Sequence, residues 1–268
     1  MTKDRLLELR KRYPRNIDYF AAVERENAAE RPAIPEPIEV VQPIIPKDGD
    51  AEYIAAVQAK LPSWLPGDAS VGPSDLLPYF NGHLPRFQAQ LAFWHLMEDE
   101  GIIPESVYDL GTPFPFTSWY WALRHASRVT FGCLGKYRDL GERSKNVEIN
   151  LCDMPALPAA ELVIATEVLE HLPCDLHAVA DWLFSLVEHR GCLLLSFPLN
   201  GANARYYNRD LPLPRAVSHG HLREFTMETS SVFVERLCQL DAEIFADRTV
   251  FTSAYGGYIR NVLIRRIH

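Results

Sequence analysis

Two carboxylates and an imidazole stand close together in the stretch Glu161–Leu172, which reads Glu-Leu-Val-Ile-Ala-Thr-Glu-Val-Leu-Glu-His-Leu. The residues in question are Glu167, Glu170 and His171, spaced by three and four positions. On a helix, this spacing places all three side chains on one face. Imidazole exchanges protons near neutral pH, and carboxylates and imidazoles both bind divalent cations. The set therefore suits general acid–base chemistry or metal binding.

The same stretch predicts the elements that position these groups. Leu162–Ala165 is a short apolar run, rich in branched residues, of the length that a buried parallel strand needs. After Thr166 the period changes, and Val168, Leu169 and Leu172 fit one apolar helical face. We therefore expect a buried strand followed directly by a helix. In open α/β sheets, ligands bind beyond the carboxyl ends of the strands, which is where this cluster is expected to lie.

Strand and helix patterns alternate along most of the chain. The predicted strands are Ser106–Leu110, Arg128–Phe131, Val147–Leu151, Leu162–Ala165, Gly191–Phe197, Ala242–Phe251 and Tyr258–Arg266. Besides the helix after Thr166, helices are predicted at Asp50–Lys60, at Leu84–Glu100, through Trp119 to Arg124, at Leu176–Glu188 and at Thr226–Leu240, and Leu61–Pro78 is expected to be loop-rich. This alternation predicts an α/β fold with a doubly wound, seven-stranded sheet. The sheet is expected to be mostly parallel and to end in a C-terminal antiparallel hairpin.

The amino-terminal part has a different character. Thr2–Glu30 has a helical pattern and a local excess of basic residues, and Arg31–Pro46 contains five prolines, which exclude a regular helix. We therefore expect a helical and irregular N-terminal extension over residues 1–81. It is predicted to cap the acceptor side of a second domain, 82–268, which holds the sheet.

Composition narrows the class of protein. The formal net charge of -8 over 268 residues disfavours a protein that wraps nucleic acid, because phosphate binding needs clustered Lys and Arg. No apolar run approaches the about 18 residues of a membrane span, and no signal-peptide core follows Met1. The cysteines are scattered and odd in number: Cys133, Cys152, Cys174, Cys192 and Cys238. They predict reduced, mostly buried thiols in a cytoplasmic protein.

Four segments carry a resemblance to a known family. They are Val107–Gly111 (Val-Tyr-Asp-Leu-Gly), Asn150–Met154 (Asn-Leu-Cys-Asp-Met), Glu161–Leu172 and Gly191–Pro198 (Gly-Cys-Leu-Leu-Leu-Ser-Phe-Pro). From about Leu84 to its end, the chain resembles the class I S-adenosylmethionine-dependent methyltransferases. The strongest of these signals is Glu161–Leu172, which looks similar to the family's fourth-strand motif. The resemblance implies methyl transfer from S-adenosylmethionine.

The resemblance also implies where this cofactor binds. The loop Gly111–Thr117 is expected under the methionine part, Asp153 and Met154 beside the adenine, and Thr166 with Glu167 at the sulfonium. Asp153 is expected to accept a hydrogen bond from the adenine amino group. The cofactor-binding residues implied in this way are Asp109, Gly111, Thr112, Cys133, Asp153, Met154, Thr166 and Glu167.

Two features depart from the family pattern. The family's first loop normally has further glycines, but Thr112–Thr117 has none and contains two prolines, which stiffen the loop and remove two backbone donors. An acidic residue usually holds the ribose hydroxyls after the second strand, where this chain has Gly-Cys-Leu at positions 132–134. Cofactor binding is therefore retained, rearranged or lost, and the sequence leaves these alternatives open.

A metal site is also implied. The helical Glu167, Glu170 and His171, with a distant histidine, resemble the metal site of the small-RNA 3′-terminal 2′-O-methyltransferases and of ubiquinone-pathway O-methyltransferases. His221 takes the fourth place because an Arg-Glu-Phe-Thr sequence follows it closely, and His219 is the reserve. These ligand types suit Mg²⁺, Mn²⁺, Fe²⁺ or Zn²⁺. The alternative is a metal-free site in which His171 or His221 is the base, so the candidate catalytic residues are His171, His221 and Glu167.

These patterns predict an O-methyltransferase that acts on a small hydroxylated acceptor, such as a sugar or a biosynthetic intermediate. The long irregular segment Pro198–His221 is typical of a functional loop. Its aromatic and basic residues either contact a sugar or phosphorylated acceptor or are plain surface residues: Arg205, Tyr206, Tyr207, Arg209 and Arg215. Two alternatives remain, an RNA 2′-O-methyltransferase and a non-catalytic binding or scaffold protein. The oligomeric state is left open.

Overall fold

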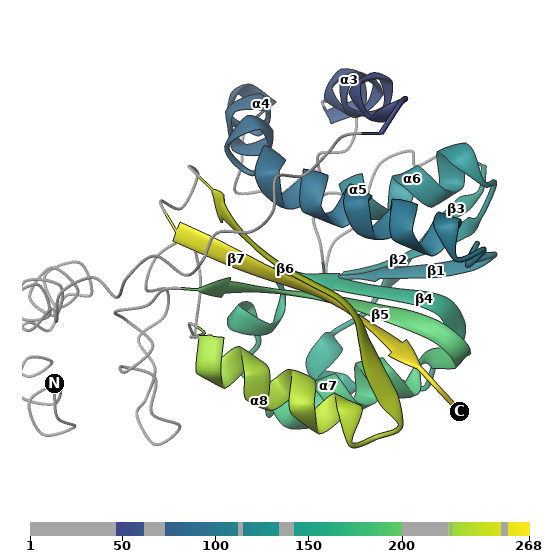
Figure 1. The fold of residues 1–268 in the computed structure, drawn as a ribbon, viewed down its shortest axis with the longest axis vertical. Helices are drawn as coiled ribbons and strands as arrows, with labels where there is room; N and C mark the ends of the chain where they lie inside the picture. Colours follow the sequence, from purple (N-terminus) through teal and green to yellow (C-terminus); the bar gives the residue numbers. More distant parts are fainter. Residues whose placement is uncertain are drawn as a thin grey trace, which may run out of the picture.

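A seven-stranded sheet forms the centre of the protein (Figure 1). The computed structural model spans residues 1–268 and describes residues 47–61, 73–111, 115–133, 142–199, 225, 227–252 and 257–268. The strands are β1 Ser106–Leu110, β2 Arg128–Cys133, β3 Ser144–Glu148, β4 Ala160–Thr166, β5 Val187–Leu199, β6 Ala242–Thr252 and β7 Gly257–Arg266. The helices are α3 Asp50–Lys60, α4 Pro73–Gly82, α5 Leu84–Asp99, α6 Phe116–Arg124, α7 Leu176–Ser185 and α8 Met227–Cys238. Two single 3₁₀ turns are η2 Leu151–Asp153 and η3 Leu169–His171.

The strand order is β3-β2-β1-β4-β5-β7-β6. Strands β1 to β5 pair in parallel, and β7 lies antiparallel between β5 and β6. The predicted doubly wound sheet with its C-terminal antiparallel hairpin is thus confirmed. The chain builds outward from β1 to β3 and then returns to place β4 beside β1. Ligands of open α/β sheets bind at such a switch point, beyond the carboxyl ends of the two strands.

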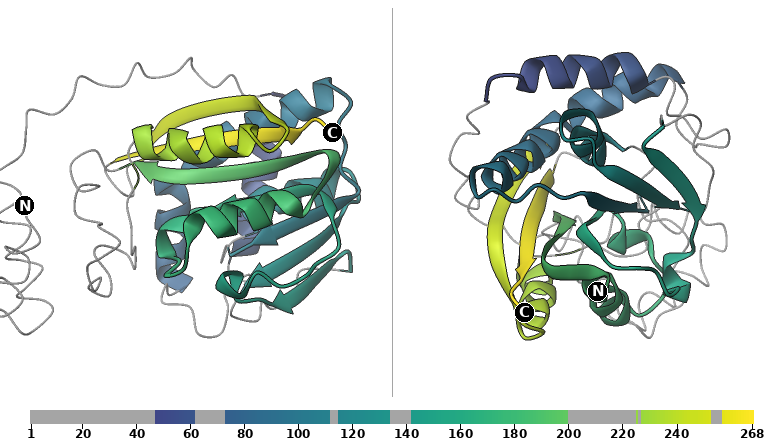
Figure 2. Two further views of the ribbon diagram at one scale, coloured as in Figure 1. Left: turned by 90° about the horizontal axis from the view of Figure 1, so that it is seen from below. Right: turned by 90° about the vertical axis from the view of Figure 1, so that its right-hand side faces the viewer.

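Helices cover both faces of the sheet. Figure 1 shows α3, α4, α5 and α6 over one face and α7 and α8 over the other, and Figure 2 shows the same layers from two further sides. Alternate residues of β5 face the two helical layers in turn, because successive side chains of a strand point to opposite faces of the sheet. Leu193 and Leu195 are buried in the core beneath α7 and α8, whereas Leu194 is buried in the core beneath α5 and α6.

The two helices that precede α5 belong to this second core. Tyr53 and Val57 of α3 and Phe80 of α4 are buried together with Phe87 and Phe116. The hydroxyl of Tyr53 donates a hydrogen bond to the backbone carbonyl of Phe116. Residues 47–61 and 73–82 therefore pack into the sheet domain, and the division of the chain at residue 82 stays a prediction. The predicted helix Thr2–Glu30 and linker Arg31–Pro46 lie outside the described residues.

Several predicted element bounds differ from the structure. The third strand lies at Ser144–Glu148 and not at Val147–Leu151, because the side chain of Asn150 accepts a hydrogen bond from the Cys152 amide and starts a helical turn there. Part of the predicted loop Leu61–Pro78 is helical, since α4 begins at Pro73. In α4, the packing of Phe80 into the core outweighs the low helix propensity of the local sequence.

The prediction of five reduced cysteines was wrong. Cys152 and Cys174 form a disulfide with a Cα–Cα distance of 5.6 Å, which lies in the usual range for such bonds. Cys133, Cys192 and Cys238 take part in no disulfide. Within the described parts of the chain, no helix combines the length and the apolar character needed to cross a membrane.

A pair of substitutions in α4 tests whether this helix belongs to the core. Phe80 is 2% exposed and stacks on Phe87 with 5.1 Å between ring centroids, so Phe80→Ala is expected to lower the free energy of unfolding by about 3–5 kcal/mol. Leu77 on the same helix is 47% exposed, so Leu77→Ala should change it by less than about 0.5 kcal/mol. Urea denaturation measures both. Equal, small losses would mean that α4 does not pack on the sheet domain.

Candidate functional site

Polar side chains from separate elements meet at the carboxyl ends of the central strands. Asp109 comes from β1, Glu167 directly follows β4, and Ser196 lies in β5. Arg86, near the start of α5, reaches Glu167. All four side chains are buried or nearly so. The residues that sequence analysis singled out beyond the first and fourth strands therefore do lie at one edge of the sheet.

Glu167 is held in an unusual backbone conformation. Its φ angle is 55°, in the left-handed region that few non-glycine residues occupy. Ser196 lies beside Thr166 in the parallel register of β4 and β5. The Ser196 hydroxyl accepts a hydrogen bond from the Glu167 amide at 2.8 Å and donates one to Glu167 Oε1 at 2.7 Å. One serine thus fixes both the backbone and the carboxylate of Glu167.

This geometry corrects the expected helix after Thr166. The chain turns away from β4 at Glu167 and then forms only the short turn η3, so no α-helix carries the Glu-Glu-His set. Glu170 and His171 are neighbours in that single turn. The spacing argument failed here because the hydrogen bond from the Glu167 amide to Ser196 and the left-handed conformation of Glu167 override the local helical pattern.

Arg86 is the main residue that sequence reasoning missed. Its Nη1 lies 3.5 Å from Glu167 Oε2, and the two side chains are 6% and 7% exposed. The guanidinium lies over the ring of Phe87, 4.5 Å from its centroid. A signal was available in the sequence. Arg86 and Gln90 lie one turn apart on a helix whose apolar residues predicted a broad buried face, and buried polar residues need specific partners.

Gln90 ties α5 to the sheet and to α6. Its side-chain amide nitrogen donates to Asn261 Oδ1 of β7 at 3.0 Å, and its amide oxygen accepts from Thr117 Oγ1 of α6 at 2.7 Å. All three side chains are buried. Because Gln90 is one turn beyond Arg86, these bonds set the register of α5 and hence the position of the guanidinium.

Glu170 is a fully buried carboxyl group. Neither oxygen makes a hydrogen bond among the described residues, and His171 Nε2 lies 3.8 Å from Oε1. Burial raises the pKa of Glu170 well above its usual value, and the negative charge of Glu167 raises it further. Burial also raises the pKa of Glu167, while the charge of Arg86 and the hydrogen bond from Ser196 oppose that rise. Burial thus favours the neutral form of both groups, and the charge of Arg86, which faces Glu167, opposes this effect.

The described residues lend no support to the predicted metal site. Within the part of the chain that the structure describes, no group of three or more His, Cys, Asp or Glu side chains is arranged to hold a metal ion. Glu167 is engaged by Arg86 and Ser196, and the side chain of His171 is 39% exposed. The remaining proposed ligand His221, its reserve His219 and the basic and aromatic residues of 205–215 lie outside the described residues.

The end of β1 and the turn after it are tightly built. Asp109 is 1% exposed; its Oδ2 accepts a hydrogen bond from the Ser118 hydroxyl, and its Oδ1 makes none among the described residues. Gly111 has a φ angle of 83°, and its amide donates to the carbonyl of Gly132 at 2.6 Å. A Cβ on Gly111 would come within 2.7 Å of Val168 Cγ1, so only glycine fits. The following Thr112 lies outside the described residues.

The expected adenine and ribose side is more open. Asp153 is exposed, whereas Met154 and Cys133 are half-buried. No acidic residue ends β2, but Glu148 pairs with Cys133 across β2 and β3 and is exposed. Where the methionine part of S-adenosylmethionine is expected, the glycine turn and Asp109 Oδ1, which makes no hydrogen bond among the described residues, fit this cofactor. At the ribose end, the usual acid is absent from β2.

No protein-family model matches the sequence, and no curated protein matches it either. Solved structures do match the fold. The N-methyltransferase NodS from Bradyrhizobium japonicum WM9 has a TM-score of 0.51 and 11% identity over 72% of this chain and 99% of NodS. Its complex with S-adenosyl-L-homocysteine has a TM-score of 0.53 and 10% identity over 81% and 99% of the two chains.

A putative S-adenosylmethionine-dependent methyltransferase from Listeria monocytogenes also matches, with a TM-score of 0.50 and 14% identity over 65% of this chain and 98% of the other. At such low identity these similarities show the fold and nothing finer. The chain has the class I methyltransferase fold, as the motifs of the sequence predicted.

The buried carboxyl of Asp109 predicts a pH dependence of stability. Burial raises its pKa from 3.8 to about 8, although the hydrogen bond from Ser118 opposes the rise. Between these values the folded state holds a proton that the unfolded state has lost. Stability therefore falls as the pH rises from about 4 to about 8, by at most about 1.4 kcal/mol per pH unit for this group. Asp109→Asn should flatten that decline.

The measurement is urea denaturation of both proteins at a series of pH values. Asp48→Asn is the control, because that side chain is exposed and should leave the slope unchanged. Identical slopes for the wild type and Asp109→Asn would show that Asp109 is ionised throughout this range.

Proposed function

We propose that the protein is a methyltransferase that uses S-adenosylmethionine and acts on the hydroxyl group of a small molecule, such as a sugar or a biosynthetic intermediate. The observation that supports this most is the placement of Glu167. It is a buried carboxylate with a raised pKa at the carboxyl edge of a methyltransferase-type sheet, directly beyond β4. Ser196 and Arg86 hold it in place.

The chain offers residues for each part of the cofactor, which when bound supplies a methyl group on a positively charged sulfur. Gly111 keeps the backbone close beneath the methionine part, and the free oxygen of Asp109 faces no other partner among the described residues. Asp153 and Met154 are the proposed adenine contacts. Thr166 and Glu167 are proposed at the sulfonium, where a carboxylate stabilises the positive charge.

A hydroxyl acceptor must lose its proton as it attacks, and Glu167 is the group proposed to take it. A carboxylate whose pKa is raised by burial is a better base than an exposed one at neutral pH. Ser196 fixes Oε1, which leaves Oε2 as the atom that receives the proton. The guanidinium of Arg86 favours the ionised form of Glu167, because its charge opposes the effect of burial.

The two alternatives differ in their support. An amine acceptor, as for an N-methyltransferase such as NodS, has its own lone pair and needs little help from a base. The buried base here therefore favours a hydroxyl. Action on RNA is disfavoured by the net charge of -8. The second alternative is a non-catalytic protein with this fold. It is supported by Thr112–Thr117, which contains no glycine, and a cofactor-binding test distinguishes it from an enzyme.

Glu167→Gln is expected to separate binding from chemistry. The amide keeps the shape of the side chain but does not take a proton, so turnover should fall by about 10²–10⁴-fold. Affinity for S-adenosylhomocysteine, which lacks the sulfonium charge, should change little, whereas affinity for S-adenosylmethionine should fall. The measurements are isothermal titration with both compounds, and release of S-adenosylhomocysteine in the presence of a panel of sugars and other hydroxylated small molecules. Glu100→Gln, an exposed position, is the control.

Three results would contradict the proposal in different ways. A flat titration at millimolar cofactor would indicate the non-catalytic alternative. Full turnover by Glu167→Gln would remove Glu167 as the base and leave His171 or His221. Loss of turnover in a chelator, restored by Mg²⁺ or Mn²⁺, would restore the metal site formed by Glu167, Glu170, His171 and His221.

A further inference from the structure

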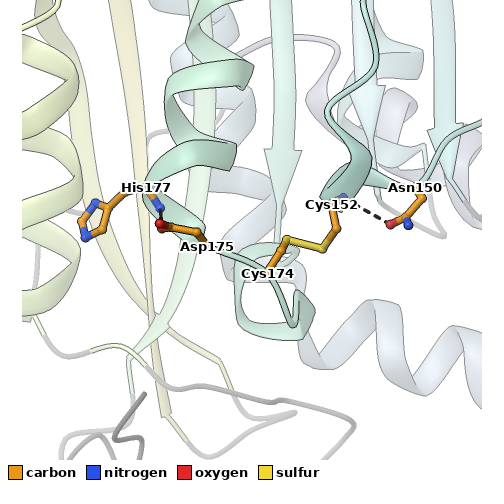
Figure 3. Close-up of a disulfide and its surroundings, with 5 residues drawn as sticks. All are labelled: Asn150, Cys152, Cys174, Asp175 and His177. Atoms are coloured by element: carbon orange, nitrogen blue, oxygen red, sulfur yellow. Dashed lines mark hydrogen bonds between the residues drawn. A yellow bond between two sulfur atoms is a disulfide. The ribbon is translucent and has the colours of Figure 1, made fainter. Parts of the chain in front are cut away.

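The disulfide between Cys152 and Cys174 joins two segments at the carboxyl edge of the sheet. Cys152 lies in η2, which follows β3, and Cys174 lies between η3 and α7 (Figure 3). The two cysteines are 22 positions apart in the sequence. The cross-link therefore closes a loop of chain that contains the whole of β4 and the turn after it.

Both cysteines stand at fixed points of the backbone. The side chain of Asn150 accepts a hydrogen bond from the Cys152 amide at 3.2 Å and caps η2. The side chain of Asp175 accepts one from the His177 amide at 2.9 Å and caps the start of α7 (Figure 3). Because each cysteine is next to the capped start of a helical segment, the disulfide restricts the position of η2 relative to α7.

The closed loop contains several of the groups proposed to act in methyl transfer. Asp153 and Met154, the proposed adenine contacts, directly follow Cys152 in the chain. Glu167 and Glu170 precede Cys174 by seven and four positions. The disulfide thus fixes the adenine side of the proposed cofactor site relative to the turn that holds Glu167 and Glu170.

We propose that this disulfide is a reducible site that controls cofactor binding: the oxidised protein binds S-adenosylmethionine tightly, and reduction weakens the binding. The inference rests on the proposed function, since it assigns η2 to the adenine. The physical reason is preorganisation. A cross-link that holds two binding segments at their bound spacing removes the cost of ordering them when the ligand arrives.

The chemistry needs a dithiol reductant. One thiolate of the dithiol attacks a sulfur of the Cys152–Cys174 bond and forms a mixed disulfide, and its second thiol then displaces the protein sulfur. One S–S bond breaks in the protein and one forms in the reductant, and the two protein thiols receive two electrons and two protons. Cys152 and Cys174 are both half-buried, so a small dithiol reaches them, whereas Cys192 is fully buried.

The test compares the oxidised protein with the protein treated with dithiothreitol. Isothermal titration with S-adenosylhomocysteine should show an affinity about 5-fold or more weaker after reduction. Amide hydrogen exchange over residues 150–157 should become faster, and the melting temperature should fall because the unfolded chain regains freedom. Alkylation and mass analysis should find two more labelled cysteines after reduction, at positions 152 and 174.

Two variants complete the design. A double variant, Cys152→Ser with Cys174→Ser, should match the reduced wild type in affinity and exchange, with or without dithiothreitol. Cys238→Ser lies in α8 and outside the pair, so it should respond to dithiothreitol as the wild type does.

The outcomes separate this inference from the function on which it rests. If neither form binds the cofactor, the proposed function fails. If, in addition, amide hydrogen exchange over residues 150–157 is the same in both forms, the proposed ordering of this segment by the disulfide is wrong as well. Cofactor affinity that is equal in both forms would overturn the control of binding. Labelling of Cys152 and Cys174 without any reductant would overturn the cross-link itself.

Discussion

The burial of two carboxyl groups beside the guanidinium of Arg86 is the interaction on which the rest of the site depends. Glu167 and Glu170 both lie out of water at the end of β4, and Arg86 is the cation that the described part of the chain places beside them. An uncompensated buried charge costs several kcal/mol, so the charge of Arg86 and the raised pKa of each carboxyl both lower the cost of burying this pair. Gln90, bonded to Asn261 and to Thr117, keeps α5 in the register that this arrangement needs.

The same constraint explains the backbone at this edge. Glu167 adopts a left-handed conformation that few non-glycine residues occupy, and such strain persists only where the surroundings enforce it. Ser196 provides that enforcement through two hydrogen bonds to one residue. On the opposite side of β4, Gly111 lets the chain leave β1 beneath Val168 without a clash. Strain, burial and a close backbone approach thus coincide where the fold places its ligand.

Much of this architecture was predictable because it depends on local patterns. Apolar runs and their spacing gave most of the strand positions and the C-terminal hairpin. Glu167 was found by its position after a strand, and Asp109 and Gly111 were implied by the family resemblance. The site partners were not predictable in this way. Arg86 meets Glu167 from a helix far earlier in the chain, and no local pattern marks that pairing.

The two main errors have the same origin. The helix expected after Thr166 was argued from its own residues, but the hydrogen bond from the Glu167 amide to Ser196 in a neighbouring strand decides the backbone there. The disulfide was missed because Cys152 and Cys174 are joined only when β3 and β4 end at the same edge of the sheet.

The acceptor was not predictable from the fold either. The fold is shared with methyltransferases of different acceptors, so the acceptor depends on side chains that the fold does not dictate.

The most direct test of this account is a carbon-13 NMR titration of the carboxyl groups, with Glu167→Gln and Glu170→Gln used to assign the two signals. The account predicts that Glu170 keeps its proton well above its usual pKa of 4.5 and that Arg86→Met raises the pKa of Glu167 further. If both groups instead titrate near 4.5 and do not respond to the loss of Arg86, the buried pair beside Arg86 is not the centre of this site.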